Sequence, residues 1–206
     1  NLAVSISQSK KENVHAVFVF TASVWLLVTT SIGLLLLCNF TQSILPKDSL
    51  HYLSLHAHIG IVGWFLLLVI VVGSRLMPMF LISKYDNRKE LWLIYFLVNG
   101  ALISFLILFF SGVDDVLYIL PMSCILLALI LFAQYCYKAY QQRIRKQVDE
   151  QVKISLLSIA MMLLPILLLL VMIVLLVFSF ANAKLALAYG FSIFFGWLTA
   201  IILGMT

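Results

Sequence analysis

Residues 56–74 read HAHIGIVGWFLLLVIVVGS and contain no charged side chain. This stretch belongs to a longer run, because no Lys, Arg, Asp or Glu occurs between Asp48 and Arg75. A helix needs roughly 20 apolar residues to cross about 30 Å of hydrocarbon. The run therefore predicts a transmembrane helix with two histidines and two glycines near one of its ends.

The whole chain has the same character. Of its 206 residues 64% are hydrophobic and 10% are charged, and the mean hydropathy is +1.15. Long apolar runs separated by short polar gaps indicate an all-α, polytopic helical bundle and not a β-barrel, whose strands alternate in short segments. We expect a single transmembrane domain over 1–206 with spans near 13–38, 53–82, 91–111, 116–138, 154–180 and 185–206. Because Thr206 falls inside an apolar run, we expect the chain to be part of a longer product.

The distribution of cations predicts the orientation. Ten Lys and Arg residues fall on one side of the spans and two, Lys47 and Lys184, on the other. The positive-inside rule then places both ends of the chain in the cytoplasm and the loops 39–52, 112–115 and 181–184 outside. The formal charge of +5 is thus explained by membrane topology and gives no reason to expect a nucleic-acid partner.

Three of the four histidines lie close together, at positions 51, 56 and 58. On an α-helix His56, Gly60 and Gly63 share one stripe, whereas His58 points to nearly the opposite side. A histidine beside two glycines leaves space along this face of the helix. The space suits either a porphyrin with an axial imidazole or a closely packed second helix, since small residues let membrane helices approach.

The pattern HAHIGIVGWFLLLVIVVGSRLMPMF, residues 56–80, resembles the second-helix region of relatives of haem-copper oxidase subunit I, including haem-containing proteins of the nitric-oxide-response type. FFGWLTAIILGMT, residues 194–206, partly echoes it and suggests a degenerate repeat. In that superfamily a histidine on the outer half of the second helix ligates the low-spin haem. The resemblance therefore implies a bacterial inner-membrane protein that binds one b-type haem through His56 or His58.

The four histidines are too few for the oxygen- or nitric-oxide-reducing site of that superfamily. We therefore expect no complete reductase, and an enzymatic activity stays open. The expected role is electron transfer, redox or nitric oxide sensing, or assembly of a respiratory complex, with other respiratory subunits or a second copy as partners. By depth, Met122 and Met172 are candidates for the second axial ligand, since histidine–methionine ligation holds haem iron in other proteins.

Two alternatives come from the same residues. One is an accessory or structural membrane subunit without a cofactor, in which Gly60 and Gly63 serve helix packing. The other is a copper-handling protein, because imidazoles, Met122, Met172 and Cys124 near the outer surface form a soft-ligand set for Cu(I).

Overall fold

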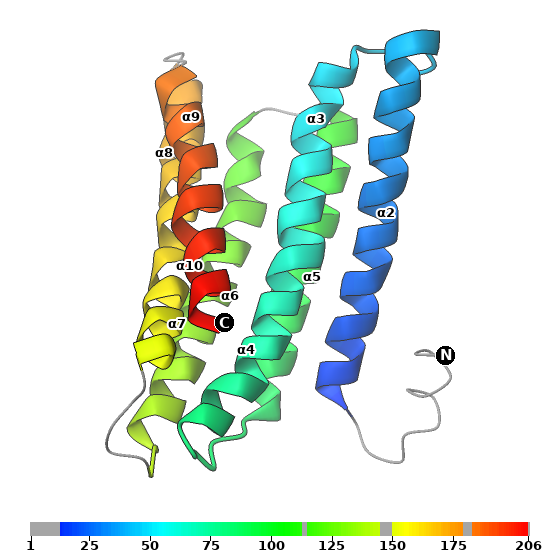
Figure 1. Cartoon of the computed structure of the whole chain (residues 1–206). Helices are drawn as coiled ribbons and strands as arrows, with labels where there is room; N and C mark the ends of the chain where they lie inside the picture. The colour runs from blue at the N-terminus through cyan, green and yellow to red at the C-terminus, as the bar shows by residue number, and fades with distance from the viewer. Residues whose placement is uncertain (1–12, 113–114, 145–149, 179–182, 206) are drawn as a thin grey trace. The chain divides into compact units, whose positions relative to one another are not determined.

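The computed structural model describes residues 13–112, 115–144, 150–178 and 183–205. Helices account for almost all of them, and the described residues contain no β-strand. Within these ranges, six helices are long and apolar enough to cross a bilayer: Val14–Gln42, Ser49–Phe80, Arg88–Ser111, Val116–Gln141, Glu150–Leu175 and Lys184–Leu203 (Figure 1). The predicted all-α class is confirmed, and the six helices have the length and apolar composition expected of the predicted spans. Parts of the expected outer loops 112–115 and 181–184, and Thr206, lie outside the described residues.

By their internal contacts the residues form two compact units, Asn1–Gly73 and Ser74–Thr206, and each is described by itself. The first unit is a helical hairpin. Its first helix is α2, Val14–Gln42. The second is continuous from α3, Ser49–His58, through the π-helical segment η1, Ile59–Leu66, into α4, Leu67–Phe80, and α2 packs along α3 and η1.

The turn of this hairpin is organised by the buried side chain of Asn39. Its Oδ1 accepts a hydrogen bond from the backbone N–H of Leu45 at 2.7 Å. Its Nδ2 donates to Ser49 Oγ at 3.1 Å and to the Lys47 carbonyl at 3.3 Å. The amide thus uses its acceptor and both donors to close the connection between α2 and α3.

The second unit holds the remaining helices, and its consecutive membrane-length helices pack against each other. They are α5 (Arg88–Ser111), the 3-10 turn η2 (Asp115–Tyr118), α6 (Ile119–Gln141), α7 (Glu150–Met161), α8 (Leu163–Val177), α9 (Ala183–Phe191), the π-helical η3 (Ser192–Leu198) and α10 (Thr199–Met205). The most extensive pairings join α5 to α6 and α7 to α10.

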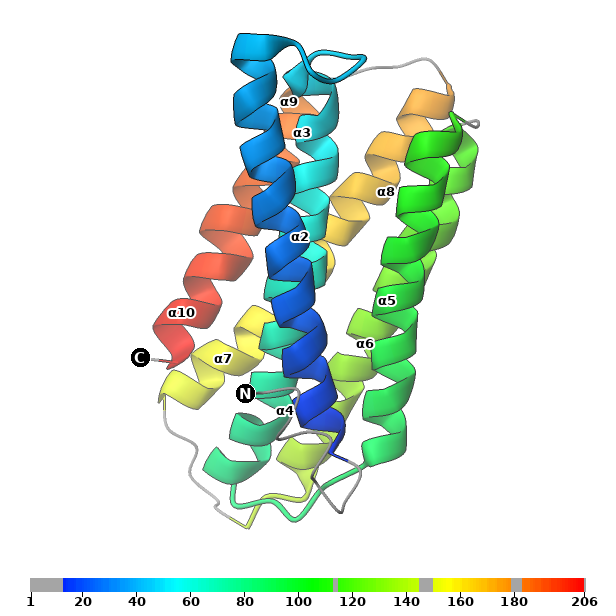
Figure 2. The same ribbon diagram turned by 90° about the vertical axis from the view of Figure 1, so that its right-hand side faces the viewer.

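Two prolines interrupt helical hydrogen bonding with different results. Before Pro165 the regular helix is broken at Met162, so the fifth span consists of α7 and α8 (Figure 2). Pro78 lies inside α4, and the helix continues to Phe80. Proline has no N–H for the carbonyl four residues earlier, that of Ser74. The Tyr135 hydroxyl of α6 donates to this carbonyl at 3.3 Å, so the freed acceptor is satisfied by a neighbouring helix.

The two sequence stretches that echo each other share a backbone feature. Gly63-Trp64 lies in η1 and Gly196-Trp197 lies in η3, and both segments are π-helical. In each case the glycine faces the preceding span of its own unit. A Cβ on Gly63 would meet Trp25 of α2, and one on Gly196 would meet Met161 of α7. π-Helical turns are rare and frequently occur at functional sites, which draws attention to η1 and the histidines just before it.

Candidate functional site

The predicted stripe of His56, Gly60 and Gly63 exists, and it faces α2. A Cβ placed on Gly60 would lie 3.1 Å from Thr29 Cγ2. One on Gly63 would lie 2.9 Å from Trp25 Cγ. These separations are at or below van der Waals contact, so the two glycines allow α2 to approach closely and leave no room for a flat ring between the helices.

The imidazole of His56 fits onto the third glycine of this interface, Gly33 of α2. A Cβ on Gly33 would lie 3.0 Å from His56 Cε1, 3.6 Å from Nδ1 and 3.8 Å from Nε2. The edge of the ring that carries both nitrogens is therefore turned towards α2. The buried Nδ1 has no hydrogen-bond partner within the described part of the chain. The His56 side chain therefore packs into the contact between the two helices, and a haem cannot reach its ring nitrogens from the side of α2.

His58 is held differently. Its Nδ1 lies 2.7 Å from the carbonyl oxygen of Ser54, one turn earlier in the same helix. Because a carbonyl only accepts, Nδ1 carries the proton, and Nε2 carries the lone pair. Metal-ligating histidines are commonly fixed in this way, with one ring nitrogen donating to a backbone carbonyl and the other facing the metal. The ring is half-buried.

The position of His58 along its helix suits a ligand near one surface of a bilayer. The helix Ser49–Phe80 has 32 residues. At 1.5 Å per residue it is about 48 Å long, somewhat more than the 40–45 Å of a bilayer with its headgroups. His58 lies nine residues after Ser49, hence about 13 Å from that end. A centred helix puts it just inside the hydrocarbon.

The other predicted ligands belong to the second unit. Met122 is buried in α6, and Met172 is half-buried in α8, a helix that packs against α6. Cys124, the third soft ligand of the copper hypothesis, is half-buried two residues after Met122. The structure keeps His56, His58, Gly60 and Gly63 together on one helix, and the two methionines on neighbouring helices of the other unit.

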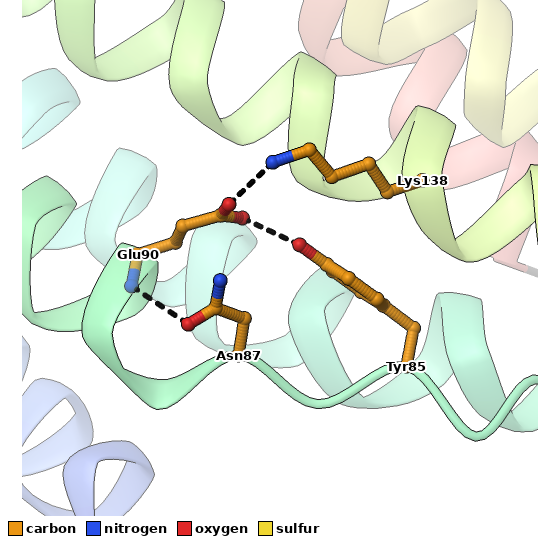
Figure 3. Close-up of polar contacts among 4 residues, drawn as sticks. All are labelled: Tyr85, Asn87, Glu90 and Lys138. Atoms are coloured by element: carbon orange, nitrogen blue, oxygen red, sulfur yellow. Dashed lines mark hydrogen bonds and ion pairs between the residues drawn. The ribbon is translucent and has the colours of Figure 1, made fainter.

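A polar cluster at the N-terminal end of α5, which is drawn in Figure 3, was not predicted from the sequence. Glu90 accepts hydrogen bonds from the Tyr85 hydroxyl at 2.8 Å and from the Lys138 ammonium. Asn87 caps α5 by accepting from the Glu90 backbone N–H at 3.4 Å. An Asn followed three residues later by Glu resembles a capping-box signature, which was the available signal. Lys138 lies 48 residues further on, so the ion pair itself has no local signal.

Burial raises the pKa of Tyr85, and its hydrogen bond to the Glu90 carboxylate raises it further. Tyr85 therefore remains a neutral donor at physiological pH. The cluster joins the 81–87 connection, α5 and α6. Both carboxylate oxygens of Glu90 accept a hydrogen bond, one from Tyr85 and one from Lys138. Its arrangement is that of a structural tie at a membrane boundary.

Comparison with known protein families, with curated proteins and with solved structures finds no match for the chain.

Proposed function

We propose that the chain is a multi-pass membrane protein that binds one b-type haem with His58 as an axial ligand and serves electron transfer or redox sensing. The observation that carries the proposal is the fixed imidazole of His58, whose Nδ1 donates to the Ser54 carbonyl at 2.7 Å. The resemblance of residues 56–80 to the second helix of haem-copper oxidase relatives supports it. A location in the bacterial inner membrane, with both ends of the chain in the cytoplasm, is part of the same proposal.

Of the two histidines, His58 fits a haem ligand better than His56. The ring nitrogens of His56 lie against Gly33, where α2 is in contact. The hydrogen bond to Ser54 fixes the tautomer of His58 and restricts rotation of its ring, so less entropy is lost when a ligand bond forms. Met122 and Met172 remain proposed second ligands, and a donor from a partner subunit is the alternative. A bound haem would supply a one-electron couple whose potential depends on the axial pair.

The second candidate function is that of a structural or accessory membrane subunit without a cofactor. The packing of Gly60 and Gly63 against Thr29 and Trp25 favours it, because this contact accounts for both glycines without a porphyrin. The two candidates differ in a single prediction, the presence of a chromophore that depends on a histidine of α3.

Histidine variants of the full chain, expressed in a haem-replete bacterium and purified in mild detergent, test the proposal. The His58→Ala variant is expected to lose the Soret band of the wild type while the amount of inserted protein is unchanged. The His56→Ala variant is expected to keep most of it. His51→Ala is the matched control, since His51 is exposed at the start of the same helix.

Loss of the band in His56→Ala with retention in His58→Ala would reverse the ligand assignment. Retention in both variants would exclude His56 and His58 as required haem ligands. A wild-type protein that inserts well and stays colourless would favour the structural subunit.

A further inference from the structure

The α4–α5 connection carries more positive charge than its own carboxylates can neutralise. Residues 81–90 contain two carboxylates, and both are engaged. Asp86 pairs with Arg88 at 3.6 Å. Glu90 pairs with Lys138 and also accepts from Tyr85, as Figure 3 shows. No acidic side chain of this segment is left for a further cation.

Three cations near this connection have no counter-ion among the residues that the structure describes. Arg75, Lys84 and Lys89 are exposed, and none of them forms an ion pair or side-chain hydrogen bond with any residue that the structure describes. Arg75 is unusual among them because it lies within a membrane-spanning helix. Cations in such positions are costly unless they are paired or reach the interface.

The length of the helix places Arg75 at the level of the lipid phosphates. The span Ser49–Phe80, about 48 Å long, exceeds the hydrocarbon core of about 30 Å by about 9 Å at each end if it is centred. Arg75 precedes Phe80 by five residues, which is about 7–8 Å along the axis. Its Cα therefore lies close to the hydrocarbon–headgroup boundary, and its long side chain extends towards the headgroups.

We propose that Arg75 binds the phosphate of an anionic phospholipid in the leaflet at the α4–α5 end of the protein. The planar guanidinium can donate two parallel hydrogen bonds to a phosphate, which an ammonium cannot do. Lys84 follows α4 and Lys89 lies in the first turn of α5, so both add positive charge at the same membrane boundary. A lipid with a net negative charge is therefore expected to bind better than a zwitterionic one. This inference does not depend on the haem proposal.

The test uses the full-length purified chain after delipidation in a non-ionic detergent. Native mass spectrometry counts bound phosphatidylglycerol and phosphatidylcholine over a titration of each lipid. The wild type is expected to prefer phosphatidylglycerol, and Arg75→Gln is expected to bind it about fivefold more weakly, as for one basic residue at a membrane surface. Arg75→Lys, which keeps the charge without the planar fork, is expected to fall between the two.

Arg88→Gln is the matched control, because Arg88 is also exposed at this boundary but pairs with Asp86; its lipid affinity should equal that of the wild type. Inorganic phosphate at the same concentrations should neither bind nor displace the lipid, since it lacks the acyl chains that hold a lipid headgroup beside Arg75. Equal binding of the two lipids by the wild type, or unchanged affinity in Arg75→Gln, would overturn the proposal. Displacement of the lipid by free phosphate would show an anion site that is not specific for lipid.

Discussion

Replacing Tyr135 by Phe should expose the cost of keeping Pro78 inside a transmembrane helix. Proline offers no N–H to the Ser74 carbonyl, and the Tyr135 hydroxyl donates to that oxygen at 3.3 Å. The exposed fraction of Tyr135 is 1% and that of Ser74 is 3%, so water does not replace the lost donor. A buried acceptor deprived of its partner costs about 1–3 kcal/mol. Because this bond is long, we expect Tyr135→Phe to lower the free energy of unfolding by about 1–2 kcal/mol.

A double-mutant cycle isolates this interaction. Pro78→Ala restores a backbone N–H that can bond to Ser74, so the hydroxyl of Tyr135 becomes dispensable. In that background Tyr135→Phe should cost less than in the wild type, with a coupling energy of about 1 kcal/mol. The ring contact of Tyr135 with Tyr85, whose centroids are 5.1 Å apart, is retained by Phe in both backgrounds.

The assay is reversible unfolding of the purified protein in mixed micelles with increasing SDS, followed by circular dichroism. Tyr137→Phe is the matched control, since Tyr137 is on the same helix and 59% exposed, and its substitution should stay within about 0.5 kcal/mol of the wild type. Equal effects of Tyr135→Phe and Tyr137→Phe, or strict additivity with Pro78→Ala, would show that the Tyr135 hydroxyl does not stabilise the helix at Pro78.

The remaining stability predictions concern the hairpin of the first unit. Gly63→Ala should destabilise it by about 1–2 kcal/mol, because overpacking of about 1–3 kcal/mol outweighs the better helix propensity of Ala. Gly100→Ala, at a helical site where a Cβ meets nothing within 4 Å, should be neutral or stabilising; equal melting temperatures of the two variants would contradict this. Asn39→Ala should cost about 2–3 kcal/mol, because three hydrogen bonds of a buried amide are lost. Thr41→Ala is the control, since its exposed hydroxyl bonds within its own helical turn. A comparable loss of unfolding free energy in this variant would be evidence against the role of Asn39 in closing the α2–α3 connection.

Hydropathy predicted the six spans because each needs only local composition. The limits shifted where polar residues continue a helix. We expected the first span to end near residue 38, yet α2 extends to Gln42. Asn39 can lie within it because its side chain finds partners in the following connection. Those partners follow from the tertiary turn and leave no trace in the hydropathy of residues 39–42.

The α-helical repeat also predicted that His56, Gly60 and Gly63 share a face, and they do. What the face meets could not be predicted, because Gly33, Thr29 and Trp25 lie on another helix and their register is a tertiary property. The π-helical turn of η1 likewise depends on packing. So does the hydrogen bond that the Ser74 carbonyl accepts from Tyr135, 61 positions later in the chain. The Ser54–His58 bond spans one turn, so it was within reach of local reasoning.

The central claim is that this membrane protein carries one haem, and the haem content of the purified wild-type chain tests it most directly. Spectra of the oxidised and dithionite-reduced protein, with haem quantified as its pyridine complex, give the ratio of haem to protein. One b-type haem per chain is expected, with a Soret band and split α and β bands on reduction. A well-folded, membrane-inserted and colourless protein, isolated from cells supplied with haem, would contradict it.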